Sequence, residues 1–92
     1  MTGLKDPKIS IITVSYNSES SILSTLESVN EQTWKNIEHI IVDGGSQDKT
    51  IEIIQSHGSR VCRIVSEKDN GIYHAMNKGI ELCSGDVIGF LN

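Results

Sequence analysis

The 92-residue sequence predicts a single α/β domain with three layers, in which helices cover both faces of a parallel sheet. Two observations favour this fold class. Short runs rich in β-branched residues alternate along the chain with segments whose apolar residues recur at helical spacing. Strands that alternate with helices pair in parallel through right-handed crossovers. We therefore expect four parallel strands and three helices within one domain, over residues 1–92.

The first half of the chain predicts two strands and the helix between them. Residues 8–14 form a strand that is apolar enough to be buried on both faces. A helix follows from about 20 to 32, with Asn17 or Ser18 as its N-cap. Its apolar face is formed by residues three or four apart, namely Ile22, Leu23, Leu26 and Val29. Residues 37–42 are predicted to form the second strand.

The second half of the chain continues the same alternation. A short helix is expected over residues 48–55 and a third strand over 61–65. The polar loop 66–71 leads into a third helix over 72–83. A fourth strand over residues 86–91 completes the sheet.

Composition and charge exclude several classes of protein. The formal net charge is −4 and the basic residues are scattered, which argues against nucleic acid as a partner. The sequence has no signal peptide, and no apolar run approaches the ~20 residues of a membrane span, so we expect a cytoplasmic location. Cys62 and Cys83 lack the spacing of a zinc site and are interpreted as buried thiols in a reducing compartment.

The most informative stretch is 37–50, where a buried strand ends in an acid, two glycines and residues that can cap a helix. Ligands of parallel α/β sheets bind beyond the carboxyl ends of the strands. Tyr16 follows the first strand and offers a ring for stacking a base. Asp43 follows the second strand and offers an acceptor for a base or ribose, while Gly44 lets a ligand approach the backbone. These residues together suit a nucleotide.

Each candidate also has a simpler structural role. Tyr16 can cover the end of the core, and Asp43 can accept hydrogen bonds from turn amides. Asp48 fits a helix cap better than a ligand contact, and His74 fits a solvated residue in the first turn of a helix. Lys78 is either solvated or in reach of a phosphate. The sequence contains no Gly-x-Gly-x-x-Gly after the first strand, no Walker A motif and no Ser/His/Asp set.

Several motifs, in order, resemble those of family-two nucleotide-sugar glycosyltransferases, which have the GT-A fold. Residues 11–17 (Ile-Ile-Thr-Val-Ser-Tyr-Asn) are similar to the family's opening strand and loop, and 28–33 to its S-x-x-x-Q-T segment. Residues 42–50 resemble V-D-G-x-S-x-D-x-T, and 69–79 resemble D-x-G-I-Y-D-A-M-N-K-G. Residues 84–92 resemble the strand that leads to the metal-binding acids. The resemblance covers nearly the whole chain.

The resemblance implies a fold and a nucleotide site. It implies a Rossmann-like sheet with strand order 3-2-1-4. Tyr16 would lie beside uracil or another base, and Asp43 would hydrogen-bond that base. It implies Tyr16, Asp43, Asp69 and Lys78 as nucleotide-binding residues, and the positions of Asn17 and Gly44 beyond the strand ends add these two to the predicted set. The family usually has an acid where this chain has His74, so His74 receives no role.

The resemblance also implies a donor and a reaction. The expected partner is an NDP-sugar donor, with a UDP-sugar favoured, for inverting transfer to a polysaccharide or another glycan. In the family, the Asp-x-Asp motif that binds Mn²⁺ or Mg²⁺ follows the fourth strand, beyond Asn92, and the catalytic base lies further on. We therefore expect this chain to be a truncated N-terminal donor-binding part, which is inactive alone and binds no metal. No catalytic residue is expected within it. Membrane association is expected only through regions missing from this chain.

Two alternatives to an enzyme part remain open at this point. One is a non-catalytic structural fragment, and the other is a general nucleotide-binding module.

An exposed fourth strand at the edge of the sheet also predicts self-association, because unpaired edges invite pairing. The sequence leaves open the sugar, the acceptor and the linkage.

Overall fold

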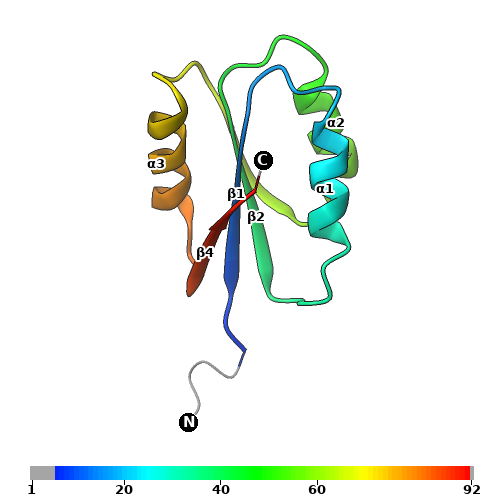
Figure 1. Ribbon diagram of the computed structural model, residues 1–92, viewed down its shortest axis with the longest axis vertical. Coiled ribbons are helices and arrows are strands. Elements are labelled where there is room, and N and C mark those ends of the chain that lie inside the picture. Colours follow the sequence, from blue (N-terminus) through cyan, green and yellow to red (C-terminus); the bar gives the residue numbers. More distant parts are fainter. Residues whose placement is uncertain (1–5, 92) are drawn as a thin grey trace.

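The computed structural model describes residues 6–91, which form one four-stranded sheet with helices on both faces (Figure 1). The elements are β1 (Ile9–Ser15), α1 (Ile22–Asn30), β2 (Ile37–Asp43), α2 (Thr50–His57), β3 (Val61–Ser66), α3 (Ile72–Leu82) and β4 (Val87–Phe90). The predicted alternation of four strands and three helices is confirmed, with boundaries within a few residues of those expected.

The sheet has the order β3-β2-β1-β4, and every neighbouring pair of strands is parallel. The predicted order 3-2-1-4 is therefore confirmed. β1 and β2 are aligned along their whole length, from Ile9 opposite Ile37 to Ser15 opposite Asp43. Consequently the carboxyl ends of these two strands lie level with each other.

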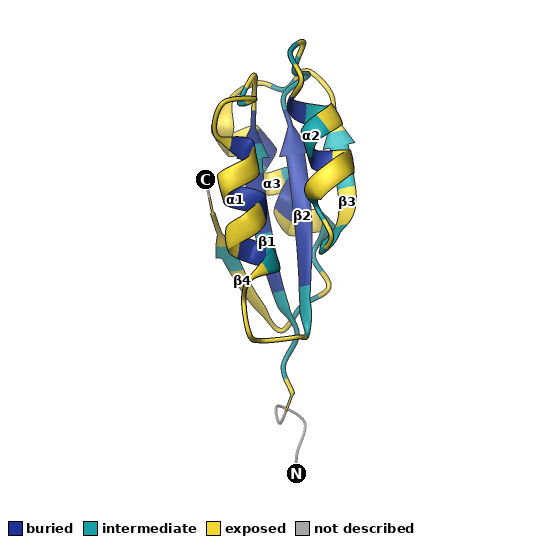
Figure 2. Cartoon of the chain, turned by 90° about the vertical axis from the view of Figure 1, so that its right-hand side faces the viewer, coloured by how far each residue is buried: buried dark blue, intermediate teal, exposed yellow. Residues whose placement is uncertain are grey.

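The core lies on both faces of the two central strands. α1 and α2 cover one face, where Ile22, Leu26 and Ile54 pack against Ile41. α3 lies on the opposite side of the sheet, where Ala75 packs with Ile40 and Val42 (Figure 1). Burial is concentrated in β1 and β2, whereas the outward surfaces of the helices are exposed (Figure 2).

The start of α1 differs from the prediction. The N-cap is Ser21, and its side chain makes no capping hydrogen bond. Ser18 instead donates its backbone N–H to Thr50 Oγ1 at 2.8 Å, and its carbonyl accepts from Ile22. The predicted caps Asn17 and Ser18 belong to the loop that precedes the helix, because contacts with the next loop hold them there.

A buried acid joins three segments at the amino end of the sheet. Glu38 accepts hydrogen bonds from Ser10 Oγ at 2.5 Å and Ser84 N at 2.7 Å, and it pairs with Lys8 Nζ at 3.2 Å. Burial opposes ionisation of Glu38, but these hydrogen bonds outweigh it and lower the pKa of Glu38 to about 2. We call Lys8, Ser10, Glu38 and Ser84 the Glu38 network.

The cysteines are less buried than predicted. Cys62 is exposed and Cys83 is half-buried, and both are free. α3 packs mainly on β1 and β2, so it leaves the face of β3 that carries Cys62 uncovered. The prediction that both thiols are buried was therefore wrong for Cys62.

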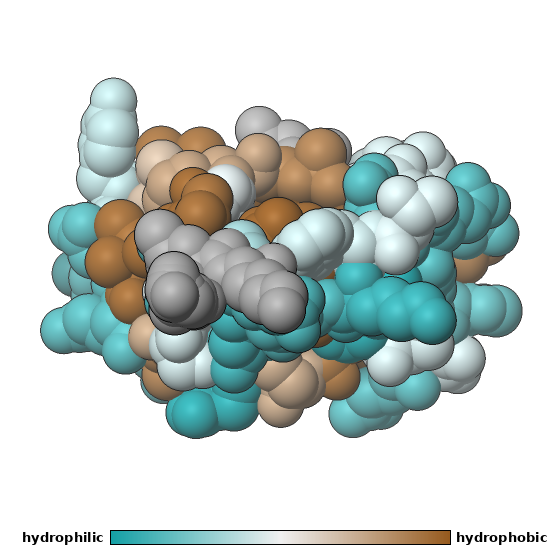
Figure 3. All heavy atoms as spheres, turned by 90° about the horizontal axis from the view of Figure 1, so that it is seen from below, coloured by the Kyte–Doolittle hydropathy of each residue, from teal (hydrophilic) through white to brown (hydrophobic). Residues whose placement is uncertain are grey.

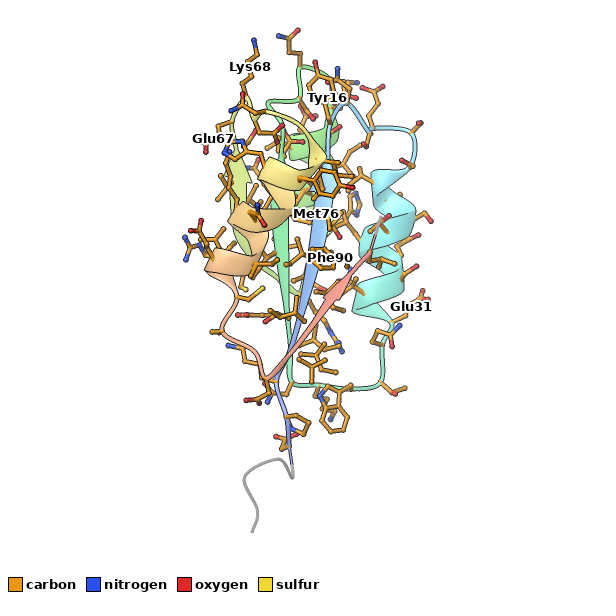
Figure 4. All side chains as sticks on the ribbon, turned by 60° about the vertical axis from the view of Figure 1, so that its left-hand side comes forward. Tyr16, Glu31, Glu67, Lys68, Met76 and Phe90 are labelled. Atoms are coloured by element: carbon orange, nitrogen blue, oxygen red, sulfur yellow. The ribbon has the colours of Figure 1, made fainter. Side chains whose placement is uncertain are left out.

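β4 forms one edge of the sheet and carries exposed apolar side chains. Val87, Ile88 and Phe90 are 52%, 42% and 46% exposed. Phe90 of β4 and Met76 of α3 are both seen on this side of the molecule (Figure 4). Viewed from the end at which the strands begin, hydrophobic side chains gather along one side of the surface (Figure 3).

Within residues 6–91, no helix combines the length and apolar character needed to cross a membrane.

Candidate functional site

A cleft of about 620 Å³ opens beyond the carboxyl ends of β1, β2 and β3. This volume lies in the range of small-molecule sites, roughly 300–1,000 Å³. Three loops form its walls, and each begins where a strand ends. The lining residues are Val14, Ser15, Tyr16, Gly44, Gly45, Gln47, Lys68, Asp69, Gly71 and Ile72. The sheet therefore gathers residues from across the sequence, as predicted for its carboxyl edge.

The side chains of Tyr16 and Asp69 both lie next to Gly44. A Cβ atom placed on Gly44 would lie 3.5 Å from Tyr16 Cδ1 and 3.4 Å from Asp69 Oδ2. The Tyr16 side chain is 59% exposed, so its ring is open to a ligand. We call the space above Gly44, next to this ring and this carboxylate, the Gly44 slot. It offers a flat apolar surface beside a hydrogen-bond acceptor.

Asp43 lies beneath the cleft and does not line it. Its side chain is 0% exposed, and its carboxylate accepts five hydrogen bonds. The donors are the Ser15, Ser46 and Ser66 hydroxyls and the backbone N–H groups of Gly45 and Ser46. Burial opposes ionisation, but the hydrogen bonds from these serines outweigh it and hold the pKa of Asp43 below its usual value.

The five bonds give Asp43 the turn-organising role that the sequence offered as an alternative to base contact. The carboxylate joins the ends of β1, β2 and β3 through Ser15, its own strand and Ser66. A base could reach Asp43 only if one of these internal donors moved away. The geometry therefore favours Asp43 as the anchor of the three loops.

Gly45 allows the third loop to lie against the second. Its φ is +87°, in the left-handed region that favours glycine. A Cβ atom there would also lie 3.3 Å from the backbone nitrogen of Lys68. Nearby, the backbone N–H of Glu67 donates to the carbonyl of Asp43 at 3.0 Å. This close approach brings Lys68 and Asp69 to the cleft.

Asn17 joins the first two loops and lies outside the lining. Its φ is 46°, a left-handed conformation that Asn tolerates better than most residues. Its Oδ1 accepts from Gln47 N at 2.9 Å, and its backbone N–H donates to Ser46 Oγ at 2.8 Å. Asn17 therefore holds Tyr16 and Gly44 in place indirectly.

Lys78 is apart from the other predicted residues. Its Nζ lies 2.7 Å from Glu67 Oε1, and both side chains border a separate small hollow between β3 and α3. The predicted site residues thus divide into two groups. Tyr16, Gly44 and Asp69 come together in the cleft, whereas Asn17, Asp43 and Lys78 support the loops around it.

Three polar residues in the lining were not among the predicted binding residues. Ser15 ends β1, Gln47 follows β2 and Lys68 follows β3, and all three border the cleft. Tyr16 and Lys68 project at the same end of the molecule (Figure 4). Only their positions at or after strand ends could have indicated that these residues line the cleft. The sequence does not show in which direction the side chain of a polar loop residue points.

The model of one protein family, described as glycosyl transferase family 2, matches residues 10–92. The chain belongs to glycosyl transferase family 2. This match includes every residue of the cleft lining, so the Gly44 slot lies within the family 2 domain. The resemblance read from the sequence motifs is confirmed.

Relatives of this family 2 chain include glycosyltransferases from bacteria. An uncharacterised glycosyltransferase of Mycobacterium tuberculosis is 39% identical over 87 residues, covering 94% of this chain and 33% of the relative. The amylovoran biosynthesis glycosyltransferase AmsB of Erwinia amylovora is 37% identical over 94 residues, covering 97% of this chain and 31% of the relative. The chain thus spans about a third of the length of these relatives.

Solved glycosyltransferase structures share the fold of this family 2 domain. The mannosyltransferase PcManGT from Pyrobaculum calidifontis, solved with GDP-Man and Mn²⁺, aligns with a TM-score of 0.80 and 25% identity, over 89% of this chain and 26% of its own. S. aureus TarS 1–349, in complex with UDP-GlcNAc, aligns with a TM-score of 0.81 and 25% identity, over 91% of this chain and 26% of its own. These structures confirm the predicted GT-A, Rossmann-like class.

Proposed function

We propose that this chain binds the nucleotide of an NDP-sugar donor in the cleft, as part of an enzyme for inverting transfer of the sugar to a polysaccharide or another glycan. One observation carries the proposal. Tyr16 and Asp69 face a common slot over the bare backbone of Gly44, at the carboxyl ends of parallel strands. The proposal is supported by the donor nucleotides named for PcManGT and TarS.

Each group in the slot has a distinct task in this proposal. The Tyr16 ring stacks on the base, and such stacking contributes about 1–3 kcal/mol per base. The Asp69 carboxylate accepts a hydrogen bond from a ring N–H of the base. Uracil and guanine carry such an N–H, whereas cytosine does not. The Lys68 ammonium supplies positive charge at the rim of the cleft, where it can meet the diphosphate.

The transfer step requires more than this cleft. In an inverting transfer, the acceptor hydroxyl attacks the anomeric carbon while a carboxylate takes its proton and the nucleoside diphosphate leaves. A divalent metal offsets the charge that develops on the leaving group. Within residues 6–91, no group of three or more His, Cys, Asp or Glu side chains could hold a metal ion. We therefore assign no step to a metal in this domain, and we propose that the chain alone binds donor without transferring sugar.

Calorimetric titration with UDP and with GDP tests the proposal, using the chain and an Asp69→Asn variant. We expect saturable binding of UDP by the chain and binding at least tenfold weaker by the variant, because a carboxylate acceptor for the base N–H is replaced by an amide that can turn a donor toward it. Glu52→Gln, which neutralises an exposed carboxylate on α2, is the matched control and should bind as the parent does.

The outcomes separate the candidate functions. Tighter binding of GDP than of UDP would support the donor-binding function and would identify guanine as the preferred base. Undetectable binding of both nucleotides would contradict the proposal and favour a non-catalytic structural part.

A further inference from the structure

One hydrogen bond fastens the loop that carries Asp69 to the helix that follows it. The backbone N–H of Asn70 donates to His74 Nδ1 at 3.0 Å. His74 is the third residue of α3, so its ring reaches back over the first turn of the helix. A side chain at this position commonly accepts a hydrogen bond from the backbone just before the helix, as Glu does in a capping box. Here an imidazole performs that task.

The rest of the loop has few other fixed points. At the β3 end, Glu67 N donates to the Asp43 carbonyl, and the Glu67 carboxylate pairs with Lys78. At the α3 end, Gly71 N donates to Asp69 Oδ1 at 3.1 Å. Gly71 has a φ of +111°, and no atom lies within 4 Å of the position of its missing Cβ. The contact between Asn70 and His74 is therefore one of a small number of bonds that fix how the Asp69 segment meets the helix.

Charged residues flank His74 in the sequence, on the loop before it and on its own helix. The loop contributes Glu67, Lys68 and Asp69, and α3 contributes Lys78 one turn further on. The hydrogen bond from Lys78, followed by its charge, lowers the pKa of Glu67, and a charge on His74 acts in the same direction. A protonated His74 would thus be attracted toward Glu67, the present partner of Lys78.

We propose that His74 is a positioning residue for the nucleotide cleft, which holds the Asp69 loop only while its imidazole is neutral. A neutral imidazole has one nitrogen that accepts, whereas both nitrogens of the protonated ring are donors. Protonation therefore removes the acceptor for Asn70 N–H, releases the loop and lowers nucleotide affinity. The inference rests on the proposed function, and it gives donor binding a pH dependence that originates in the protein.

Two variants of His74 test the proposal by titration with UDP at pH 5.5 and pH 8.0. His74→Gln keeps an acceptor that does not titrate, and His74→Leu has none. Because UDP itself ionises in this range, the measured quantity is the ratio of the affinities of chain and variant at one pH. We expect the chain to match His74→Gln at pH 8.0 and to bind three- to tenfold more weakly at pH 5.5. His74→Leu should be weaker than His74→Gln at both pH values.

A matched control is His57→Gln, which changes an exposed histidine at the end of α2, outside the cleft lining. It should keep the full pH dependence of the chain. An affinity ratio of chain to His74→Gln that is the same at both pH values would overturn the proposal.

A second measurement needs no nucleotide. Amide hydrogen exchange by NMR reports whether Asn70 N–H has its acceptor. At pH 8.0, we expect protection of this amide in the chain and in His74→Gln, and several-fold less in His74→Leu. At pH 5.5, relative to His74→Gln, the chain should lose that protection. Equal protection in all three proteins at both pH values would overturn the role of His74. The expected exchange pattern without UDP binding would support that role and contradict the proposed function.

Discussion

Ser15 and Asp43 are register partners at the carboxyl ends of β1 and β2, and the Ser15 hydroxyl donates to Asp43 Oδ1 at 2.7 Å. The backbone adds a second link, because Gly44 N donates to the Ser15 carbonyl at 2.8 Å. These bonds fix the points at which two loops leave the sheet. The positions of Tyr16 and Gly44 therefore depend on an acid that does not line the cleft.

Asp43→Asn should destabilise the domain. The amide has one oxygen and one NH₂ group, so at least two of the five hydrogen bonds are lost or must reverse direction, which only the serine hydroxyls can do. We expect the free energy of unfolding to fall by about 2–4 kcal/mol, measured by urea denaturation at pH 7. Glu52→Gln changes an exposed carboxylate and should stay within about 0.5 kcal/mol of the parent. An equally small change for Asp43→Asn would contradict the anchoring role.

Tyr16→Ala should weaken UDP binding by roughly tenfold or more, because the stacking surface is lost. Tyr16→Phe keeps the ring and should remain within about threefold of the parent. Tyr73→Ala is the matched control, since Tyr73 is the other tyrosine and is 79% exposed on α3. Calorimetric titration measures all four proteins. If Tyr16→Ala and Tyr73→Ala bind equally well, the ring of Tyr16 takes no part in recognition.

The neighbouring glycines should respond to alanine in opposite ways. At Gly44, the added Cβ meets only ordinary contacts, so Gly44→Ala should fold normally but fill the slot and weaken UDP binding. At Gly45, the positive φ and the contact with Lys68 N make alanine strained. Gly45→Ala should lower the free energy of unfolding by about 1–3 kcal/mol. Urea denaturation and UDP titration of both variants check this contrast, which would fail if Gly44→Ala were the less stable protein.

His39 should make stability depend on pH. The residue is 0% exposed, its Nε2 lies 2.8 Å from Thr13 Oγ1, and burial lowers its pKa from 6.5 to about 4. The unfolded chain then binds a proton at a higher pH than the folded chain does, so stability falls as pH drops from about 6.5 toward 4. Between pH 7 and pH 5 we expect a loss of about 2 kcal/mol in urea denaturation.

His39→Gln tests the source of that pH dependence, because glutamine does not titrate. The variant should show a much flatter profile between pH 7 and pH 5, whatever its absolute stability. His57→Gln removes an exposed histidine and should keep the slope of the parent. A slope that persists in His39→Gln would assign the effect to other groups.

The uncovered edge of the sheet should allow the chain to associate with itself. Among residues 6–91, β4 pairs only with β1, and Ile88 is 42% exposed there. Sedimentation equilibrium at about 10–500 μM protein should show a mass that rises with concentration, because exposed edges recruit further strands. Ile88→Lys should reduce this rise, and Leu23→Lys, at an exposed apolar position of α1, should not. A mass independent of concentration would exclude the predicted association.

The fold could be predicted because its signals are local. Each strand is a short β-branched run, and the corner from Val42 to Thr50 has a distinctive order of acid, glycines and cap. The grouping of Tyr16, Gly44 and Asp69 followed from their places after strand ends, since parallel strands bring those ends to one edge. These features depend on periodicity and topology alone.

The roles of the other predicted residues depend on distant partners and could not be predicted. The donors that saturate Asp43 include Ser15 and Ser66, which are 28 and 23 residues away. Lys78 was predicted to approach the nucleotide, but the direction of a helical side chain toward Glu67 is set by packing. The imidazole contact of His74 with Asn70 was missed because histidine is an unusual residue for capping a helix.

The Glu38 network has a consequence for how the sheet can open. Ser84 reaches Glu38 from the connection just before β4, and the next residue, Gly85, donates to Ser10 Oγ at 2.9 Å. If β4 separated from β1, Glu38 would keep its charge but lose the hydrogen bonds that Ser84 donates to it. Detachment of the last strand would thus take the two Ser84 hydrogen bonds away from an ionised carboxylate. The strand with the least hydrophobic cover is in this way retained electrostatically, so fraying at the β4 edge is coupled to an acid near the start of the central strand β2.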